Sequence, residues 1–148
     1  MNEEKLSFVV ALSGTFWERR PHFSIWLDDH QVVASEIVSL AQQEIKFERT
    51  IDEGAHTLKI RLENKTNADT NIRNGEIIDD MLLNIDDITI DDISLGNLLW
   101  SAEYILDHPQ EYRGQTITKL DNCVNLGWNG TWILKFTSPF YIWLLEQL

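Results

Sequence analysis

Two stretches decide the fold: GAHTLKIRLENKTNADT, Gly54 to Thr70, and DDMLLNIDDITIDD, Asp79 to Asp92. The first begins with alternating apolar and polar side chains in HTLKIRL and then becomes a loop of Asn, Thr and Asp. This alternation predicts a β-strand with one buried face, and Asn and Asp favour the turn that follows. The second stretch begins a strand inside a group of carboxylates. Because neighbouring carboxylates repel each other, these must be either fully solvated or neutralised by another group.

The second stretch also changes phase. Leu83 and Ile85 lie on one parity of the strand, whereas Ile88 and Ile90 lie on the other. A β-bulge at Asp86-Asp87 would insert one residue and bring both pairs to the same face. A strand buried on both faces is the alternative explanation. The period favours the bulge.

The same period of two recurs along the chain, in LSFVVAL, HFSIWL and EIKFERTI, with turn-forming residues between the runs. Short alternating strands without intervening helices predict an all-β fold, an antiparallel β-sandwich of jelly-roll type. At most one short helix is expected. We place it over Leu98 to His108, where four apolar residues share one side and Pro109 follows. GWNGTWILKF predicts a tight turn and a final strand.

The composition limits the possible partners. The chain has 148 residues, 43% of them hydrophobic, which suits a single domain over residues 1–148. Its formal net charge of −12 disfavours nucleic acid. No apolar run approaches the roughly 20 residues that cross a bilayer, so no membrane partner is expected. The start, MNEEKLSFVVALSG, carries acids where a signal peptide has basic residues, so we expect a soluble protein without a signal peptide and leave its compartment open.

No catalytic motif is present. The sequence contains no G-x-S-x-G, no H-E-x-x-H and no P-loop, and its four histidines show no pair at metal-ligand spacing. The single cysteine, Cys123, excludes an intrachain disulfide. His56 lies within a strand and is interpreted as a packed or edge histidine rather than a base. We therefore expect no enzyme activity.

The order of four segments, WLDDHQVV, EIKFERTI, EGAHTLKIRLENKT and DDMLLNIDDITI, resembles the small calcium-dependent xylan-binding carbohydrate-binding modules, which are jelly-roll β-sandwiches. The resemblance covers about residues 5–96. It rests on Gly54-Ala55-His56, on the loop residue Asn64, and on Asp80 with Asp86 behind it. It implies a non-catalytic, calcium-dependent module that binds a polysaccharide or a cell-surface glycan.

The chain departs from that family at Lys65, where the family often has an Asp, and at Met81-Leu82, which replace a polar pair. The closing segment, residues 97–148, lies outside the resemblance. Its stretch LGWNGTWILKFTSPFYIWLLEQL looks similar to the tail of small accessory proteins of marine tailed phages. That similarity implies a virion or host-cytoplasm setting.

The residues themselves also indicate a possible calcium site. Calcium prefers six to eight oxygen ligands from carboxylates, amides and backbone carbonyls. If the strands that end at Asn64 and begin at Asp80 are neighbours, several oxygen-bearing side chains could meet at one rim. The predicted metal ligands at this rim are Asn64, Asn67, Asp69, Asp79 and Asp80, and the resemblance adds Asp86. The alternative is that Asp and Asn fill this loop because they favour turns and that the acids are solvated.

A sugar-binding module also needs exposed aromatic rings, on which the apolar faces of sugars stack. Trp17 and Trp128 lie next to turns and Tyr112 lies in a polar stretch, so these three are the predicted ligand-binding residues. Trp26 and Trp143 are assigned to the core.

A rival function is docking in a phage particle, in which the apolar tail SPFYIWLLEQL would contact a protein partner or form a homo-oligomer. A glycan-active enzyme is the third and weakest possibility.

Overall fold

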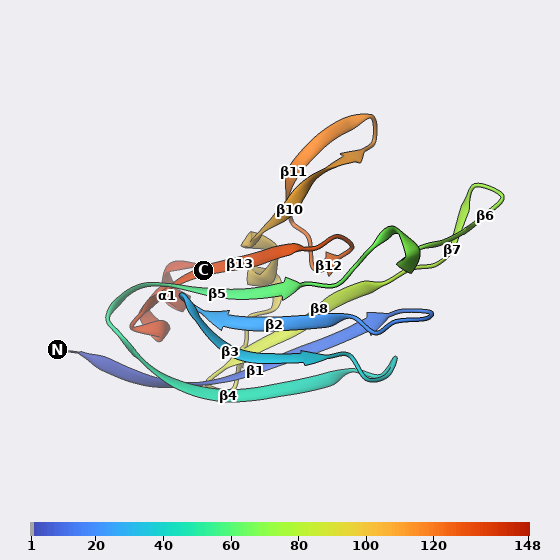
Figure 1. Cartoon of the computed structure of the whole chain (residues 1–148). Coiled ribbons are helices and arrows are strands. Elements are labelled where there is room, and N and C mark those ends of the chain that lie inside the picture. Colours follow the sequence, from blue (N-terminus) through green and yellow to red (C-terminus); the bar gives the residue numbers. More distant parts are fainter. Residues whose placement is uncertain (1) are drawn as a thin grey trace.

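The chain folds into two antiparallel β-sheets packed face to face (Figure 1). The computed structural model describes residues 2–148. One sheet has the order β12-β8-β1-β4 with β9 added beside β8, and the other has the order β11-β10-β13-β5-β2-β3. This arrangement confirms the antiparallel β-sandwich that the period of two predicts.

The strands of the first sheet are β1 (Glu3–Thr15), β4 (Gln43–Asp52), β8 (Leu82–Ile90), β9 (Ile93–Ser94) and β12 (Asn125–Leu126). Those of the second are β2 (His22–Leu27), β3 (His30–Glu36), β5 (Gly54–Leu62), β10 (Glu103–Tyr112), β11 (Gln115–Asp121) and β13 (Gly130–Ser138). A separate hairpin joins β6 (Asn71–Arg73) and β7 (Glu76–Asp79). The helical segments are two 3₁₀ turns, η1 (Asn67–Asp69) and η2 (Gly96–Ser101), and one α-helix, α1 (Phe140–Glu146).

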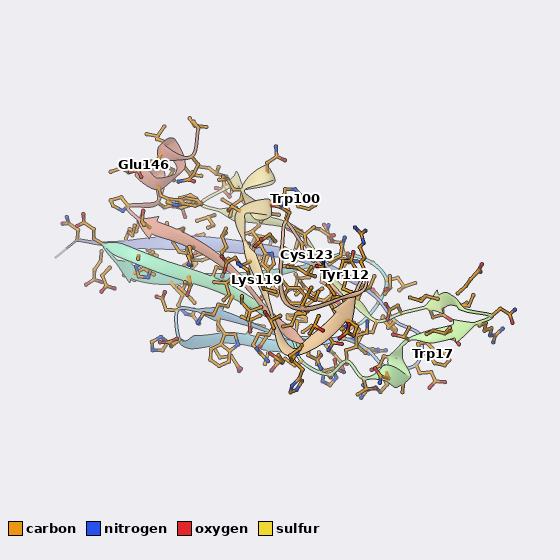
Figure 2. All side chains as sticks on the ribbon, turned by 90° about the horizontal axis from the view of Figure 1, so that it is seen from above. Trp17, Trp100, Tyr112, Lys119, Cys123 and Glu146 are labelled. Atoms are coloured by element: carbon orange, nitrogen blue, oxygen red, sulfur yellow. The ribbon has the colours of Figure 1, made fainter. Side chains whose placement is uncertain are left out.

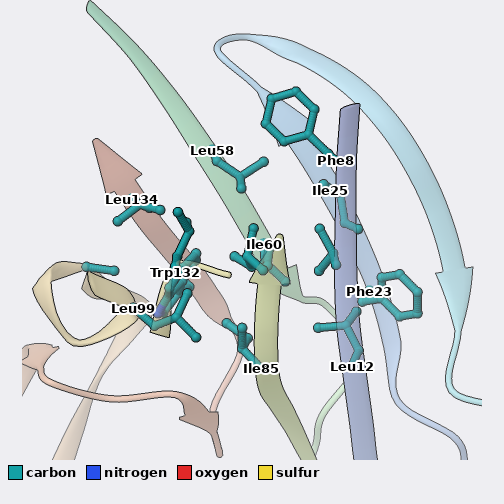
Figure 3. Close-up of a cluster of buried hydrophobic side chains, with 14 of the residues drawn as sticks. Phe8, Leu12, Phe23, Ile25, Leu58, Ile60, Ile85, Leu99, Trp132 and Leu134 are labelled. Carbon is teal, nitrogen blue, oxygen red and sulfur yellow. The ribbon is translucent and has the colours of Figure 1, made fainter. Parts of the chain in front are cut away.

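The core lies between the two sheets, where alternate side chains of neighbouring strands meet (Figure 3). Leu58, Ile60 and Leu62 of β5 are fully buried, which is the pattern that HTLKIRL predicts. Trp143 is buried as expected. Trp26 is only half-buried and differs from its core assignment, because it alternates along β2 with the core residues Ile25 and Leu27 and so lies on the opposite face of the strand. Its indole Nε1 donates to Ser24 Oγ at 2.8 Å.

The predicted bulge in β8 is confirmed. Against β1, Ala11 pairs with Asp87 and Leu12 pairs with Ile85, so Asp86 is the extra residue. The bulge places the isoleucines on both sides of it in the core, with Ile85 and Ile88 each 2% exposed or less. The phase change in the sequence is therefore one inserted residue and not a strand buried on both faces.

The predicted helix from Leu98 to His108 is wrong. Its beginning forms the 3₁₀ turn η2, and the rest belongs to strand β10. Tyr104 and Leu106 are buried while Ile105 between them is exposed, so the local period is two. The strand passes through Pro109 because the β10–β11 ladder is interrupted there, between Ile105 and Gln110.

The final strand that GWNGTWILKF predicts is β13, which pairs with β5 on one side and with β10 on the other. Gly130 lies where a side chain would not fit, since an added Cβ would lie 2.4 Å from the Ile105 carbonyl oxygen. Helix α1 follows β13, and it lies at the end of the sandwich opposite the β6–β7 hairpin (Figure 1). The β10–β11 hairpin projects away from the sheets, and η1 lies near the base of the β6–β7 hairpin.

Candidate functional site

The loop after β5 is organised around a buried carboxylate. Asp69, only 2% exposed, ends the 3₁₀ turn η1 and accepts hydrogen bonds from the Thr66 backbone N–H at 2.7 Å and the Thr66 hydroxyl at 3.1 Å. The guanidinium of Arg19 donates to both oxygens of Asp69, at 3.0 and 2.6 Å. The hydrogen bond from Arg19 lowers the pKa of Asp69 and outweighs the effect of burial, which acts in the opposite direction. The carboxylate is therefore charged and paired.

Asn64 connects the same loop to the start of β2. Its Oδ1 accepts from the His22 backbone N–H at 2.8 Å, and its Nδ2 donates to the Arg20 carbonyl at 2.9 Å. The Asn64 carbonyl accepts from Arg19 at 2.5 Å. The polar atoms of Asn64 are thus used to attach the loop to the residues before β2.

Asp80 lies between β7 and β8 and contacts two residues of the loop after β5, although β5 and β8 belong to different sheets. The Lys65 ammonium is 2.7 Å from Asp80 Oδ1. The same oxygen accepts from the Thr70 hydroxyl at 2.7 Å and from the Met81 N–H at 2.9 Å. The rim therefore joins the two stretches that decide the fold.

The other predicted metal ligands do not join this cluster. Asp79 accepts from the Asn71 amide across the β6–β7 hairpin at 3.0 Å. Asp86 accepts at 3.1 Å from Gln42, in the β3–β4 loop. Asn67 is exposed at the start of η1. Among residues 2–148, no three Asp, Glu, His or Cys side chains are grouped so that they could hold a metal ion.

A small cleft of about 190 Å³ lies beside this rim, between the η1 loop, strand β10 and the turn before β13. It combines an aromatic ring with amide, hydroxyl, imidazole and ammonium groups. Its lining residues are Lys65, Thr66, Asn67, Thr70, His108, Gln110, Trp128 and Asn129. A wall of this kind can stack against an apolar face and donate hydrogen bonds to several hydroxyl groups at once.

The aromatic ring of the cleft, Trp128, contacts Tyr112, which does not line the cleft itself. The rings of Tyr112 and Trp128 meet edge to face with centroids 5.9 Å apart, and the Arg113 guanidinium lies 5.0 Å from the Tyr112 centroid. Trp17 is exposed, but it does not line the cleft. Figure 2 shows Trp17 at the end of the sandwich near η1 and Tyr112 on the β10–β11 hairpin. Two of the three predicted aromatic residues are therefore brought together.

A larger and more open depression, about 540 Å³, lies over β2 and β3. Its only aromatic residue is Phe23, which is buried, and its polar groups include the paired His22 and Glu36, 3.1 Å apart. The depression therefore offers no exposed Trp, Tyr or Phe ring for stacking. The cleft at Trp128 is the better candidate site.

Comparison with solved structures shows a fold similar to vCBM60. The structure of vCBM60 in complex with galactobiose matches with a TM-score of 0.58 and 12% identity, over 86% of this chain and 96% of that one. A selenomethionine form of vCBM60, described with a link by circular permutation between two families of calcium-dependent carbohydrate-binding modules, matches with a TM-score of 0.57 and 14% identity, over 87% of this chain and 89% of that one. At this identity the likeness establishes the fold. No family model and no curated protein matches the chain.

Several residues of the cleft were not among the site residues predicted from the sequence, namely Lys65, Thr66, Thr70, His108, Gln110 and Asn129. His108 and Gln110 flank Pro109, and their position depends on reading this segment as a strand. Asn129 follows Trp128 in a turn, and it holds Lys65 through a reciprocal pair of hydrogen bonds, 2.8 and 2.9 Å long. An Asn in a turn next to an aromatic residue is the one local signal that could have marked it.

The described residues, 2–148, include no helix that is long and apolar enough to span a bilayer.

Proposed function

We propose that this protein is a non-catalytic carbohydrate-binding module whose ligand occupies the cleft at Trp128. The observation that carries the proposal is the composition of that cleft, in which one aromatic ring lies among the hydrogen-bonding side chains of Asn67, His108 and Gln110. Pyranose rings present apolar C–H faces and a rim of hydroxyl groups, so they match such a wall. The shared fold with vCBM60 supports this reading.

The first ligands to test are neutral oligosaccharides. One similar structure, vCBM60, contains galactobiose, and the sequence resemblance implies xylan. Binding to galactan and xylan oligosaccharides can be measured by isothermal titration calorimetry, after a screen by affinity electrophoresis. We expect Trp128→Ala to weaken binding by at least about tenfold.

The control for this experiment is Trp100→Ala. Trp100 is more exposed, at 46%, than the half-buried Trp128, and it lies in η2 and does not line the cleft. A second cleft variant, His108→Ala, removes an exposed side chain, so its fold should remain intact. Equal affinities of both cleft variants and wild type, or no binding across the glycan panel, would contradict the proposal.

Calcium does not enter this mechanism. One of the similar structures is described among calcium-dependent modules, and the sequence predicts an ion at the rim from Asn64 to Asp80. The donor groups at the rim do not fit such an ion, because Asp69 and Asp80 are paired with Arg19 and Lys65 and Asn64 is bonded to the backbone before β2. The cleft's own polar groups and Trp128 account for binding in our proposal.

A second candidate function, docking to another protein in a phage particle, is favoured by one observation. Tyr141, Ile142 and Leu145 of α1 are between 50% and 68% exposed. Beside them is a groove of about 510 Å³ that also includes Leu98 and Ile93. Exposed apolar surface of this kind is typical of interfaces. Light scattering after size exclusion tests it, since a strict monomer would argue against self-association through α1.

A further inference from the structure

Lys65 has an unusual position for a lysine in a loop. Its side chain is only 11% exposed, and its ammonium donates to the Gly127 carbonyl at 2.6 Å and contacts Asp80 at 2.7 Å. Its backbone is fixed as well, through the two hydrogen bonds with Asn129. One residue thus joins three segments: the loop after β5, the start of β8 and the turn before β13.

The Lys65 ammonium helps to compensate the charge of Asp80, as a bound cation would. Three groups contact the same oxygen of Asp80: the Lys65 ammonium, the Thr70 hydroxyl and the Met81 N–H. A partly desolvated carboxylate needs such compensation, because an unpaired buried charge is unfavourable. A divalent ion at this position would face the Lys65 ammonium at short range and would have to displace it.

Arg19 performs the same task for the other acid of the loop. It contacts both oxygens of Asp69 and also the Asn64 carbonyl. Both of the acids that the loop buries or half-buries are therefore paired with a cation from this chain. A calcium ion takes six to eight oxygen ligands, carboxylates among them. In the described residues, 2–148, no three Asp, Glu, His or Cys side chains are grouped so that they could hold a metal ion.

We propose that the Lys65 ammonium takes the place of a metal ion at this rim, so that the order of the loop and the shape of the cleft are independent of calcium. Because Lys65 also lines the cleft, the proposal deepens the proposed function: sugar binding should withstand chelators. The expectation about sugar binding rests on the proposed function, whereas the order of the loop can be tested without any sugar.

The first test uses the wild-type protein, stripped with EDTA, and needs no sugar. Calcium titration by calorimetry should give no saturable heat, and thermal melting with EDTA should match melting with excess CaCl₂, because a ligand that binds only the folded state would raise the melting temperature. Saturable calcium binding that Asp80→Asn abolishes would overturn the proposal.

The second test examines the lysine. Lys65→Met keeps a long side chain but leaves Asp80 without its cation, and we expect the melting temperature to fall by at least about 4 °C. Asp80→Asn should also lower it. The double variant Lys65→Met/Asp80→Asn removes both charges and should lose less than the sum of the single losses. Additive losses, or a single variant as stable as wild type, would contradict the role of the pair.

Lys119→Met is the matched control. Its ammonium is 3.9 Å from Glu103 and its side chain is 53% exposed, so its loss should leave the melting temperature nearly unchanged. If Lys65→Met does not fold, the Asp80→Asn variant and the calcium titration still decide the question. Failure to bind any glycan would overturn the proposed function, whereas calcium-dependent melting would overturn this inference.

Discussion

At the scale of single residues, His56 is the clearest pH-sensitive group. Its Nδ1 is 2.7 Å from an Asp28 carboxylate oxygen, and its Nε2 is 2.6 Å from the Asp52 carbonyl oxygen. Both ring nitrogens face acceptors, and only the imidazolium can donate to both. Burial lowers the pKa of His56, but the hydrogen bonds to Asp52 and Asp28 together outweigh it, so the pKa is raised.

This raised pKa predicts how stability depends on pH. The contribution of His56 to the free energy of unfolding is complete below its ordinary value of 6.5 and is lost as the pH rises through the folded-state pKa. His56→Gln should therefore lose about 1–3 kcal/mol at pH 5.5 and less at pH 8.5. Urea denaturation across this range measures it. The exposed His30 gives the control His30→Gln, and an equal loss from His56→Gln at both pH values would contradict the prediction.

The candidate site could be predicted only in part, for reasons that lie in the residues. The sequence predicts the meeting of Asp80 with the loop after Asn64 only on the condition that the two strands are neighbours. β5 and β8 lie in different sheets, and it is Lys65 and Thr70 of the loop that contact Asp80. The cations could not be predicted. Arg19 precedes β2 by three residues and reaches Asp69, fifty positions away, only after the loop has folded. The carboxylates that the sequence offers as metal ligands are paired with basic side chains in the structure, Asp69 with Arg19 and Asp80 with Lys65.

At the scale of elements, the bulge in β8 shows that the number of residues can matter more than their chemistry. Asp86 is exposed, and its one side-chain hydrogen bond is with Gln42. Its presence sets the phase between Ile85 and Ile88, which both face the core. Substitution of Asp86 by another residue should therefore be tolerated, whereas its deletion should not.

Deletion of Asp86 is expected to be much more harmful than its substitution. Deletion would turn the isoleucines on one side of the bulge toward solvent, and each buried side chain of this size contributes about 1.5–3 kcal/mol, so the loss should be roughly 3–6 kcal/mol or prevent folding. Asp86→Ala should change stability by less than about 0.5 kcal/mol. Chemical denaturation compares the two. Similar losses from both variants would show that the bulge does not set the register.

The wrong helix and the confirmed bulge have a common explanation. In β8 the alternation is continuous on both sides of one insertion, so a local pattern is sufficient. From Leu98 to His108 a 3₁₀ turn and a strand follow each other within eleven residues, and their combined apolar pattern resembles one face of a helix. The strand is selected by pairing, with β11 on one side and with β13 on the other, where Tyr104 lies opposite Trp132. That contact joins residues far apart in the sequence, and the same error hid His108 and Gln110.

At the scale of the whole molecule, the net charge of −12 should select among glycans. The one lysine that lines the cleft is paired with Asp80, so the cleft has no free cation to attract a polyanion. Charge repulsion acts over about 10 Å at 0.1 M salt and about 3 Å at 1 M. It should therefore weaken the encounter with acidic polysaccharides at low salt and leave neutral ones unaffected.

Affinity for a neutral oligosaccharide should thus stay constant between 0.05 and 0.5 M NaCl, within about twofold. Polygalacturonate and heparin should bind more weakly than the neutral ligand, and what binding they show should increase with salt as the repulsion is screened. Calorimetry at three salt concentrations measures both. The variant Lys65→Met removes the one ammonium group that lines the cleft, so its affinity for acidic glycans should fall further below its affinity for the neutral ligand than in the wild type. Tighter binding of an acidic glycan at low salt would show that the paired lysine still attracts anions and that the charge of the whole molecule does not govern ligand choice.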